Sequence, residues 1–185
     1  MTTYVVPPSY AVRVTGPLVG KGLYSGDVTT AGLALPVDLK TTTWRTVATV
    51  VVPADPGDIM TVDARARVTS ELGYPVGIGV HLWWYHADPN PNPDGTIPTV
   101  SERTWTKLAP SWGSNVTRDI HHKPFENSGL WQVPPDWPHR ADGTPSRVTF
   151  ALLADAHSTA AVAGDTVAVD PGYTLLRVRR EALAA

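Results

Sequence analysis

Six histidines are the residues in this sequence best suited to bind a metal or to transfer protons. Five of them are candidates for one common site: His81, His86, His121, His122 and His157. No H-x-H or H-E-x-x-H spacing occurs, and two adjacent imidazoles in an extended chain point to opposite faces. We therefore predict no metal site and assign the histidines to the surface or to an interface.

A nucleophilic serine would need a base and an acid that converge on it in the fold. The sequence has no G-x-S-x-G elbow, and Asp155, His157 and Ser158 are too close in sequence to converge as a triad. The sequence has 17 acidic residues that could form a catalytic carboxylate pair. Several of them, such as Asp58 and Asp165, lie beside glycines, where aspartate commonly forms a turn. With no cysteine, thiolate catalysis is excluded. We predict no catalytic residue, no cofactor and no enzyme activity.

The segment 88–95 alternates hard oxygen ligands in the pattern D-x-N-x-N-x-D-G. If Asn90 is aligned with the first ligand of a calcium loop, Ser101 stands where a bidentate glutamate belongs. Prolines at 89, 91 and 93 also stiffen the segment toward polyproline II. The pattern is more typical of a polar loop than of a calcium site.

The most informative residues are the aromatic ones, which include seven tryptophans. Along the stretch 76–85, alternation places His81, Trp83 and Tyr85 on one face together with two glycines, while the other face is aliphatic. Both faces must therefore be covered, by interior packing, by another subunit or by a sugar ring. The candidate contact residues for a subunit or a glycan are His81, Trp83, Tyr85, Trp112 and Trp131.

The composition indicates the elements that position these residues. Val and Thr contribute 23 and 22 of the 185 residues, whereas Lys and Glu number 4 each, which favours strands over helices. The 18 prolines and 15 glycines leave only 155–163 and 179–185 long enough for a stable helix. The net charge of −2 predicts no nucleic-acid partner. We also expect no membrane span and no secretion signal.

Alternating apolar residues predict an all-β domain, a jelly-roll-like β-sandwich with an extended N-terminal arm. The predicted strands cover 44–52, 59–69, 76–85, 147–155, 166–170 and 173–180. In the first of them, one face is formed by Trp44, Thr46, Ala48, Val50 and Val52. A near-repeat, GDIMTVD at 57–63 and GDTVAVD at 164–170, predicts two tight turns that each begin a strand. Residues 1–43 are predicted to form an arm or loosely attached strands, and residues 44–185 the sandwich.

Several segments together resemble the small β-sandwich virion proteins of tailed bacteriophages of actinobacteria, which decorate capsids or are minor tail components. They are VGIGVHLWWY (76–85), NVTRDIHHKP (115–124), VPPDWP (133–138), DAHSTAA (155–161) and GDTVAVDPGYTLLRVRR (164–180). The resemblance implies a virion location, with assembly in the cytoplasm of a bacterial host. It also implies a homo-oligomer, often a trimer, that docks through its N-terminal arm on major capsid or tail subunits.

From the residues and the resemblance we predict a structural protein of a bacteriophage virion that acts by self-association and docking. The alternative is a carbohydrate-binding or receptor-binding module that stacks a host glycan on its exposed aromatic residues. The residues themselves leave open whether attachment is to the head or to the tail, and which stoichiometry holds.

Overall fold

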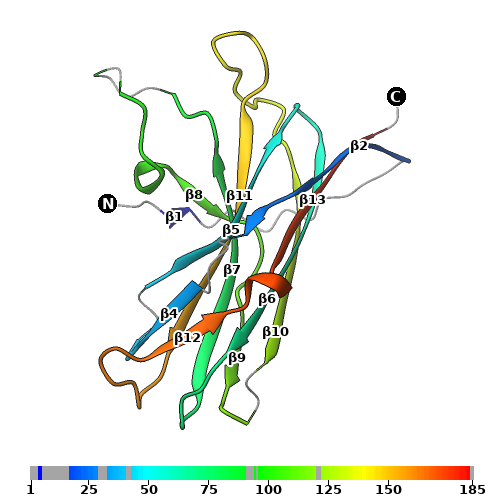
Figure 1. Ribbon diagram of the computed structural model, residues 1–185. Coiled ribbons are helices and arrows are strands. Elements are labelled where there is room, and N and C mark those ends of the chain that lie inside the picture. Colours follow the sequence, from blue (N-terminus) through cyan, green and yellow to red (C-terminus); the bar gives the residue numbers. More distant parts are fainter. Residues whose placement is uncertain are drawn as a thin grey trace.

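The computed structural model describes residues 4–5, 17–28, 33–40, 43–90, 94, 96–119 and 122–183, and these build an all-β fold (Figure 1). The strands are β1 (Tyr4–Val5), β2 (Leu18–Ser25), β3 (Asp27–Val28), β4 (Leu33–Asp38), β5 (Arg45–Pro53), β6 (Ile59–Thr69), β7 (Val76–His86), β8 (Trp105–Lys107), β9 (Trp112–Val116), β10 (Lys123–Gln132), β11 (Arg147–His157), β12 (Thr166–Val169) and β13 (Leu175–Leu183). Two single-turn 3-10 helices, η1 (Val100–Glu102) and η2 (Pro171–Tyr173), lie between strands. The predicted β-sandwich is confirmed.

Two layers of strands face each other across the core. In the first layer β11 pairs antiparallel with β7 on one side and with β5 on the other, while β8 and β9 pair with β7. In the second layer β6 pairs with β10 on one side and with β12 and β13 on the other, and β2 follows β13. Strand β4 pairs with both β11 and β12, so it joins the two layers into one continuous hydrogen-bonded unit.

The predicted alternation is confirmed in β6 and β11. The residues expected to point inward are 0–5% exposed and belong to one hydrophobic core: Met60, Val62, Ala64, Ala66, Val68, Val148, Phe150, Leu152 and Ala154. The two predicted tight turns are also present, since Gly57 and Gly164 have φ of 84° and 96°. An L side chain rarely adopts such angles, so glycine at these positions allows the sharp reversal before β6 and β12.

The prediction that Trp44 shares a face with Ala48 is wrong, because β5 contains a β-bulge. Thr46 pairs with Leu153 and Ala48 pairs with Leu152, so Val47 is an extra residue in the strand. One additional residue reverses the alternation. Ala48 therefore lies in the core, whereas Trp44 packs on the opposite face of the sheet.

The segment predicted as an arm, 1–43, lies partly outside the described residues. Its described strands pair with the sandwich: β2 runs antiparallel to β13, and Leu35 of β4 is fully buried in the core. The alternating residues at positions 10, 12 and 14 are outside the described ranges. The boundary at residue 43 stays a prediction.

The two stretches that the sequence left long enough for a helix, 155–163 and 179–185, both begin as strand. Strand β11 continues to His157, and strand β13 continues to Leu183.

A network of charges attaches β2 to the body of the sandwich. Asp58, which is 1% exposed, accepts a hydrogen bond from Nε of Arg180 at 2.5 Å and one from Nζ of Lys21 at 2.8 Å. Asp55 accepts further hydrogen bonds from both cations. Hydrogen bonds from Lys21 to Asp55 and Asp58 raise the pKa of the Lys21 ammonium. A buried carboxylate is tolerated here because cations from two strands solvate it.

We predict that Asp88→Asn destabilises the protein by about 1 kcal/mol at pH 7. The Asp88 carboxylate accepts three hydrogen bonds from Arg147, from its backbone N–H, Nε and Nη2, and this lowers the Asp88 pKa to about 2. A carboxyl whose folded pKa is below its unfolded pKa stabilises the protein above the unfolded value. The difference between wild type and variant should therefore shrink as the pH falls from about 4 to about 2.

Urea unfolding at pH 7, 4 and 2.5 measures this difference. Asp136→Asn, in an exposed turn, is the control for removing one negative charge. Equal stability of wild type and Asp88→Asn at pH 7 would contradict the prediction.

Candidate functional site

The outer face of the β7–β11 sheet, opposite the core, gathers the residues that the sequence marked as candidate contacts. On β7 this face presents His81, Trp83 and Tyr85, which are only 6%, 4% and 6% exposed. Trp83 and Tyr85 form a second hydrophobic cluster with Ala151 and Leu153 of β11. Strand β7 is therefore covered on both faces, as predicted, and the described chain itself supplies the cover.

Aromatic rings complete this outer layer. Trp44 stacks on His81, with ring centroids 4.5 Å apart and planes inclined by 16°, and it also contacts Trp83 at 5.4 Å. Trp105 packs on Tyr85 at 4.5 Å. The β5 bulge thus has a positional role, because it turns Trp44 to the side of the sheet on which His81 lies.

Beneath Trp44, three polar side chains form a hydrogen-bonded chain. Nε2 of His81 lies 2.6 Å from Oδ1 of Asp155, and Nδ1 of His81 lies 2.7 Å from Oγ of Ser111. Asp155 is 1% exposed, whereas Ser111 is at the surface. The order is therefore a buried carboxylate, a nearly buried imidazole and an exposed hydroxyl, which is the order of groups that activate a serine.

Glycine on β7 makes room for this chain. A Cβ placed on Gly79 would lie 2.2 Å from Oδ1 of Asp155 and 2.8 Å from Nε2 of His81. Gly79 is the residue opposite Asp155 in the β7–β11 register, so a side chain there would occupy the space of the carboxylate. The glycine is consequently required by the close approach of the polar pair.

The buried carboxylate of Asp155 also faces a second histidine. Nδ1 of His157 lies 4.0 Å from Oδ2 of Asp155, and the His157 side chain is 44% exposed. Within the described parts of the chain, no cluster of three or more His, Cys, Asp or Glu side chains has the geometry to hold a metal ion. His121 lies outside the described residues. His122 is near Thr69 and Asp170 on the other layer.

A separate aromatic cluster lies on the core side of β7. Trp84 packs against Trp131 and Trp137 with ring centroids 4.7 and 5.9 Å apart, and Trp131 meets the edge of Phe150. His86 stacks on Trp137 at 4.2 Å, and burial lowers the His86 pKa. Trp131 thus packs against the core and stays partly exposed.

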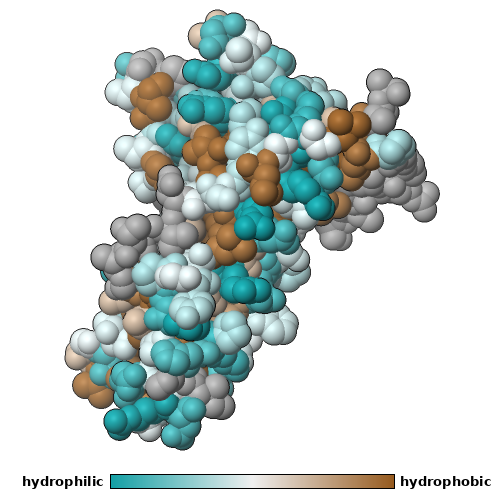
Figure 2. All heavy atoms as spheres, turned by 45° about the vertical axis from the view of Figure 1, so that its right-hand side comes forward, coloured by the Kyte–Doolittle hydropathy of each residue, from teal (hydrophilic) through white to brown (hydrophobic). Residues whose placement is uncertain are grey.

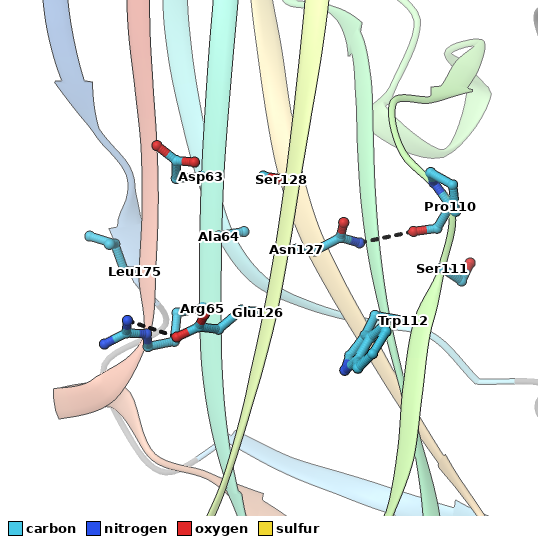
Figure 3. Close-up of a pocket in the computed structure, with 10 residues that line it drawn as sticks. All are labelled: Asp63, Ala64, Arg65, Pro110, Ser111, Trp112, Glu126, Asn127, Ser128 and Leu175. Carbon is cyan, nitrogen blue, oxygen red and sulfur yellow. Dashed lines mark hydrogen bonds and ion pairs between the residues drawn. The ribbon is translucent and has the colours of Figure 1, made fainter. Parts of the chain in front are cut away.

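The exposed Trp112 borders a surface cleft of about 550 Å³ at the side of the sandwich (Figure 3). Its indole is 56% exposed. Six of the nine other lining residues are polar, and the nine come from β6, β10, β13 and the segment before β9: Asp63, Ala64, Arg65, Pro110, Ser111, Glu126, Asn127, Ser128 and Leu175. An ion pair between Arg65 and Glu126 closes one end, and the Asn127 amide donates to the Pro110 carbonyl. An aromatic face beside such groups suits a polyhydroxylated ligand.

The structure thus distributes the five candidate contact residues among three places. His81, Trp83 and Tyr85 lie together under Trp44 and Trp105, Trp131 packs against the core while partly exposed, and Trp112 is at the cleft. Sequence reasoning missed Ser111 and its link to His81 and Asp155. The sequence did carry one indication of this link, since His81 and Asp155 each lie within a strongly apolar run. A His or Asp that is buried in such a run needs a hydrogen-bond partner.

The polar loop over 88–95 is only partly described. Asp88, the first oxygen ligand of the pattern, binds Arg147 through both carboxylate oxygens. Asp94 accepts hydrogen bonds from the backbone N–H and the hydroxyl of Thr96. Both carboxylates are thus used in structural contacts within the chain.

Comparison with known proteins gives a limited result. No family model and no curated protein matches the sequence. Among solved structures, the chain is similar to the T=1 particle protein of infectious bursal virus (12% identity, TM-score 0.47, covering 97% of this chain and 40% of that one). It is also similar to the protein of the T13 particle of infectious bursal disease virus (13%, TM-score 0.39, covering 91% and 36%).

A third solved structure is the CBM22-1 xylan-binding domain from Paenibacillus barcinonensis Xyn10C (14% identity, TM-score 0.33, covering 91% of this chain and 87% of that one). This chain spans only 40% and 36% of the two viral chains. At these identities and TM-scores, none of the three likenesses assigns a function.

Among the described residues, no helix has the length and apolar character needed to cross a membrane.

We predict that Gly79→Ala destabilises the protein by about 2–3 kcal/mol, because the new methyl group displaces Asp155 from His81 in a packed layer. Gly20→Ala in β2 is the matched control, since an added Cβ there meets no atom within 4 Å. Chemical unfolding followed by tryptophan fluorescence measures both changes. Similar stabilities of the two variants would contradict the prediction.

Proposed function

We propose that the protein is a structural subunit that works by self-association, through the edge of β2. Among the described strands, β2 pairs only with β13, so its outer edge offers backbone N–H and C=O groups to another chain. The observation that supports this function most directly is the apolar character of that edge. Natural edge strands are usually protected by charge, proline or a covering segment.

The apolar residues lie along β2 and at the end of β13, the strand pair at the upper right of Figure 1. Figure 2 shows brown, apolar atoms on this side of the molecule. Leu18 is paired with Leu183, and they are 37% and 44% exposed. Val19 and Leu23 are 54% and 62% exposed. Burial of these side chains would contribute about 25 cal/mol per Å² to association.

The one charged residue of β2 does not protect this edge. Lys21 is engaged with Asp55 and Asp58 in the body of the sandwich. A second copy of the chain offers the same edge, and two such edges related by a two-fold axis can pair antiparallel into one sheet. The proposed occupant of the edge is therefore another copy of this chain.

The finer proposal is that these subunits belong to the virion of a tailed bacteriophage, as a capsid-decoration or minor tail component. Two observations support it. The described residues of the segments that resemble such proteins lie within the sandwich, and the fold is a β-sandwich with a projecting strand pair. Under this proposal the other partners are major capsid or tail subunits, and two-fold pairing of β2 edges gives a dimer in place of the trimer that the resemblance implies.

We predict that the protein forms a defined oligomer and that Leu23→Lys shifts it to a monomer, because a lysine on the pairing edge loses apolar contact and places like charges together. Light scattering on a size-exclusion column measures the mass. Val162→Lys is the control, since Val162 is 65% exposed but lies far from β2 in sequence, between β11 and β12. A wild-type protein that stays monomeric at all concentrations would overturn the proposal.

The second candidate function is binding of a host glycan in the Trp112 cleft. The favouring observation is that an indole with 56% exposure stands beside amide, hydroxyl and carboxylate groups. Aromatic faces stack on the apolar faces of sugar rings, while such polar groups bind hydroxyls.

This second function predicts that soluble cell-wall polysaccharides quench tryptophan fluorescence and that Trp112→Ala weakens binding by about 10-fold. Tyr173→Ala removes another exposed aromatic ring, in η2, and should leave the affinity unchanged. If no polysaccharide of the panel binds, or if both variants bind like the wild type, the cleft is not a glycan site.

A further inference from the structure

We propose that Ser111 is an activated nucleophile that attacks carboxylic esters, with His81 as its general base and Asp155 as the group that orients the base. The three residues come from the segment before β9, from β7 and from β11. This activity is independent of self-association through β2, which uses another side of the molecule.

The hydrogen bonds fix the direction of proton transfer. Asp155 accepts at Oδ1, so the nitrogen that faces it, Nε2 of His81, carries the proton of the neutral imidazole. The other nitrogen, Nδ1, then has a free lone pair 2.7 Å from Oγ of Ser111 and accepts the hydroxyl proton. This is the distance at which a general base takes a proton from a nucleophile.

The surroundings hold the imidazole in this state. Asp155 is 1% exposed and contacts the imidazole through Oδ1, while its Oδ2 has no hydrogen-bond partner among the described residues. Trp44 stacks on the ring at 4.5 Å and restricts its rotation. A side chain that is fixed in this way needs little reorganisation during reaction.

A substrate can reach the nucleophile from solvent. Ser111 is exposed at the rim of the Trp112 cleft, and Figure 3 shows its hydroxyl directed away from Trp112. Next to it, Gly113 of β9 carries no side chain, and a Cβ there would meet only the carbonyl oxygen of Ile78 within 4 Å.

The proposed reaction has two steps. Oγ of Ser111 forms a bond to the acyl carbon while His81 Nδ1 takes the hydroxyl proton, and the bond from the acyl carbon to the alkoxy oxygen then breaks. The imidazolium gives its proton to the leaving alkoxide, which departs as an alcohol. Water then attacks acyl-Ser111 with His81 again as base, which releases the carboxylic acid and restores the serine.

The test uses the full chain and two probes, a fluorophosphonate and 4-nitrophenyl acetate. We expect the fluorophosphonate to modify Ser111 at least about 100-fold faster than the exposed Ser128 of the same molecules, as located by tandem mass spectrometry. Because the two serines are compared within one folded chain, this result does not depend on the stability of a variant. Equal rates at both serines, or no modification at Ser111, would overturn the proposal.

Variants then test the role of the base. Ser111→Ala should abolish release of 4-nitrophenol, whereas Ser114→Ala, which removes a nearby hydroxyl bound to Lys123, should leave it unchanged. His81→Gln should slow modification of Ser111 at least about 10-fold in protein whose unfolding transition is intact. Turnover that persists in Ser111→Ala would also overturn the proposal. Oligomeric mass is measured in the same samples, so loss of self-association and loss of acylation are distinguished.

Discussion

The burial of β11 and β7 on both faces is the constraint on which the rest of the structure depends. Nine consecutive residues of β11, from Val148 to Ala156, are buried. A strand in this position needs the core on one side and a second layer on the other. The second layer is the aromatic cover that includes Trp44 and Trp105, and it depends on the β5 bulge and on the glycines of β7. These features also determine where polar side chains can lie.

A charged residue inside such a strand must find its partners within the protein. Asp155 is that residue, and the ring of His81 supplies the hydrogen bond that water would otherwise provide. Within the part of the chain that the structure describes, hydrogen bonds lead from this pair to the surface through the hydroxyl of Ser111. The same constraint therefore explains why the outer layer is closely packed. It also explains why Asp155, His81 and Ser111 form a hydrogen-bonded chain within that layer.

Much of the fold could be predicted from the sequence, because alternation is a local property. The pattern in 59–69 and 147–155 gave the core residues, and the two apolar faces of 76–85 required a second layer. The bulge at Val47 could not be predicted, since one extra residue leaves no mark in composition. The polar chain was also hidden, because residues 81, 111 and 155 meet only through strand pairing across about 30 and 44 intervening positions.

Strand β4 has a consequence for how the molecule responds to load. Because it hydrogen-bonds to β11 in one layer and to β12 in the other, the layers cannot slide apart without breaking backbone bonds in both. Hydrophobic packing alone would let two sheets shear past each other, since it is not directional. The shared strand converts the sandwich into a single mechanical element, in which a pull on either layer is borne by the hydrogen bonds of both.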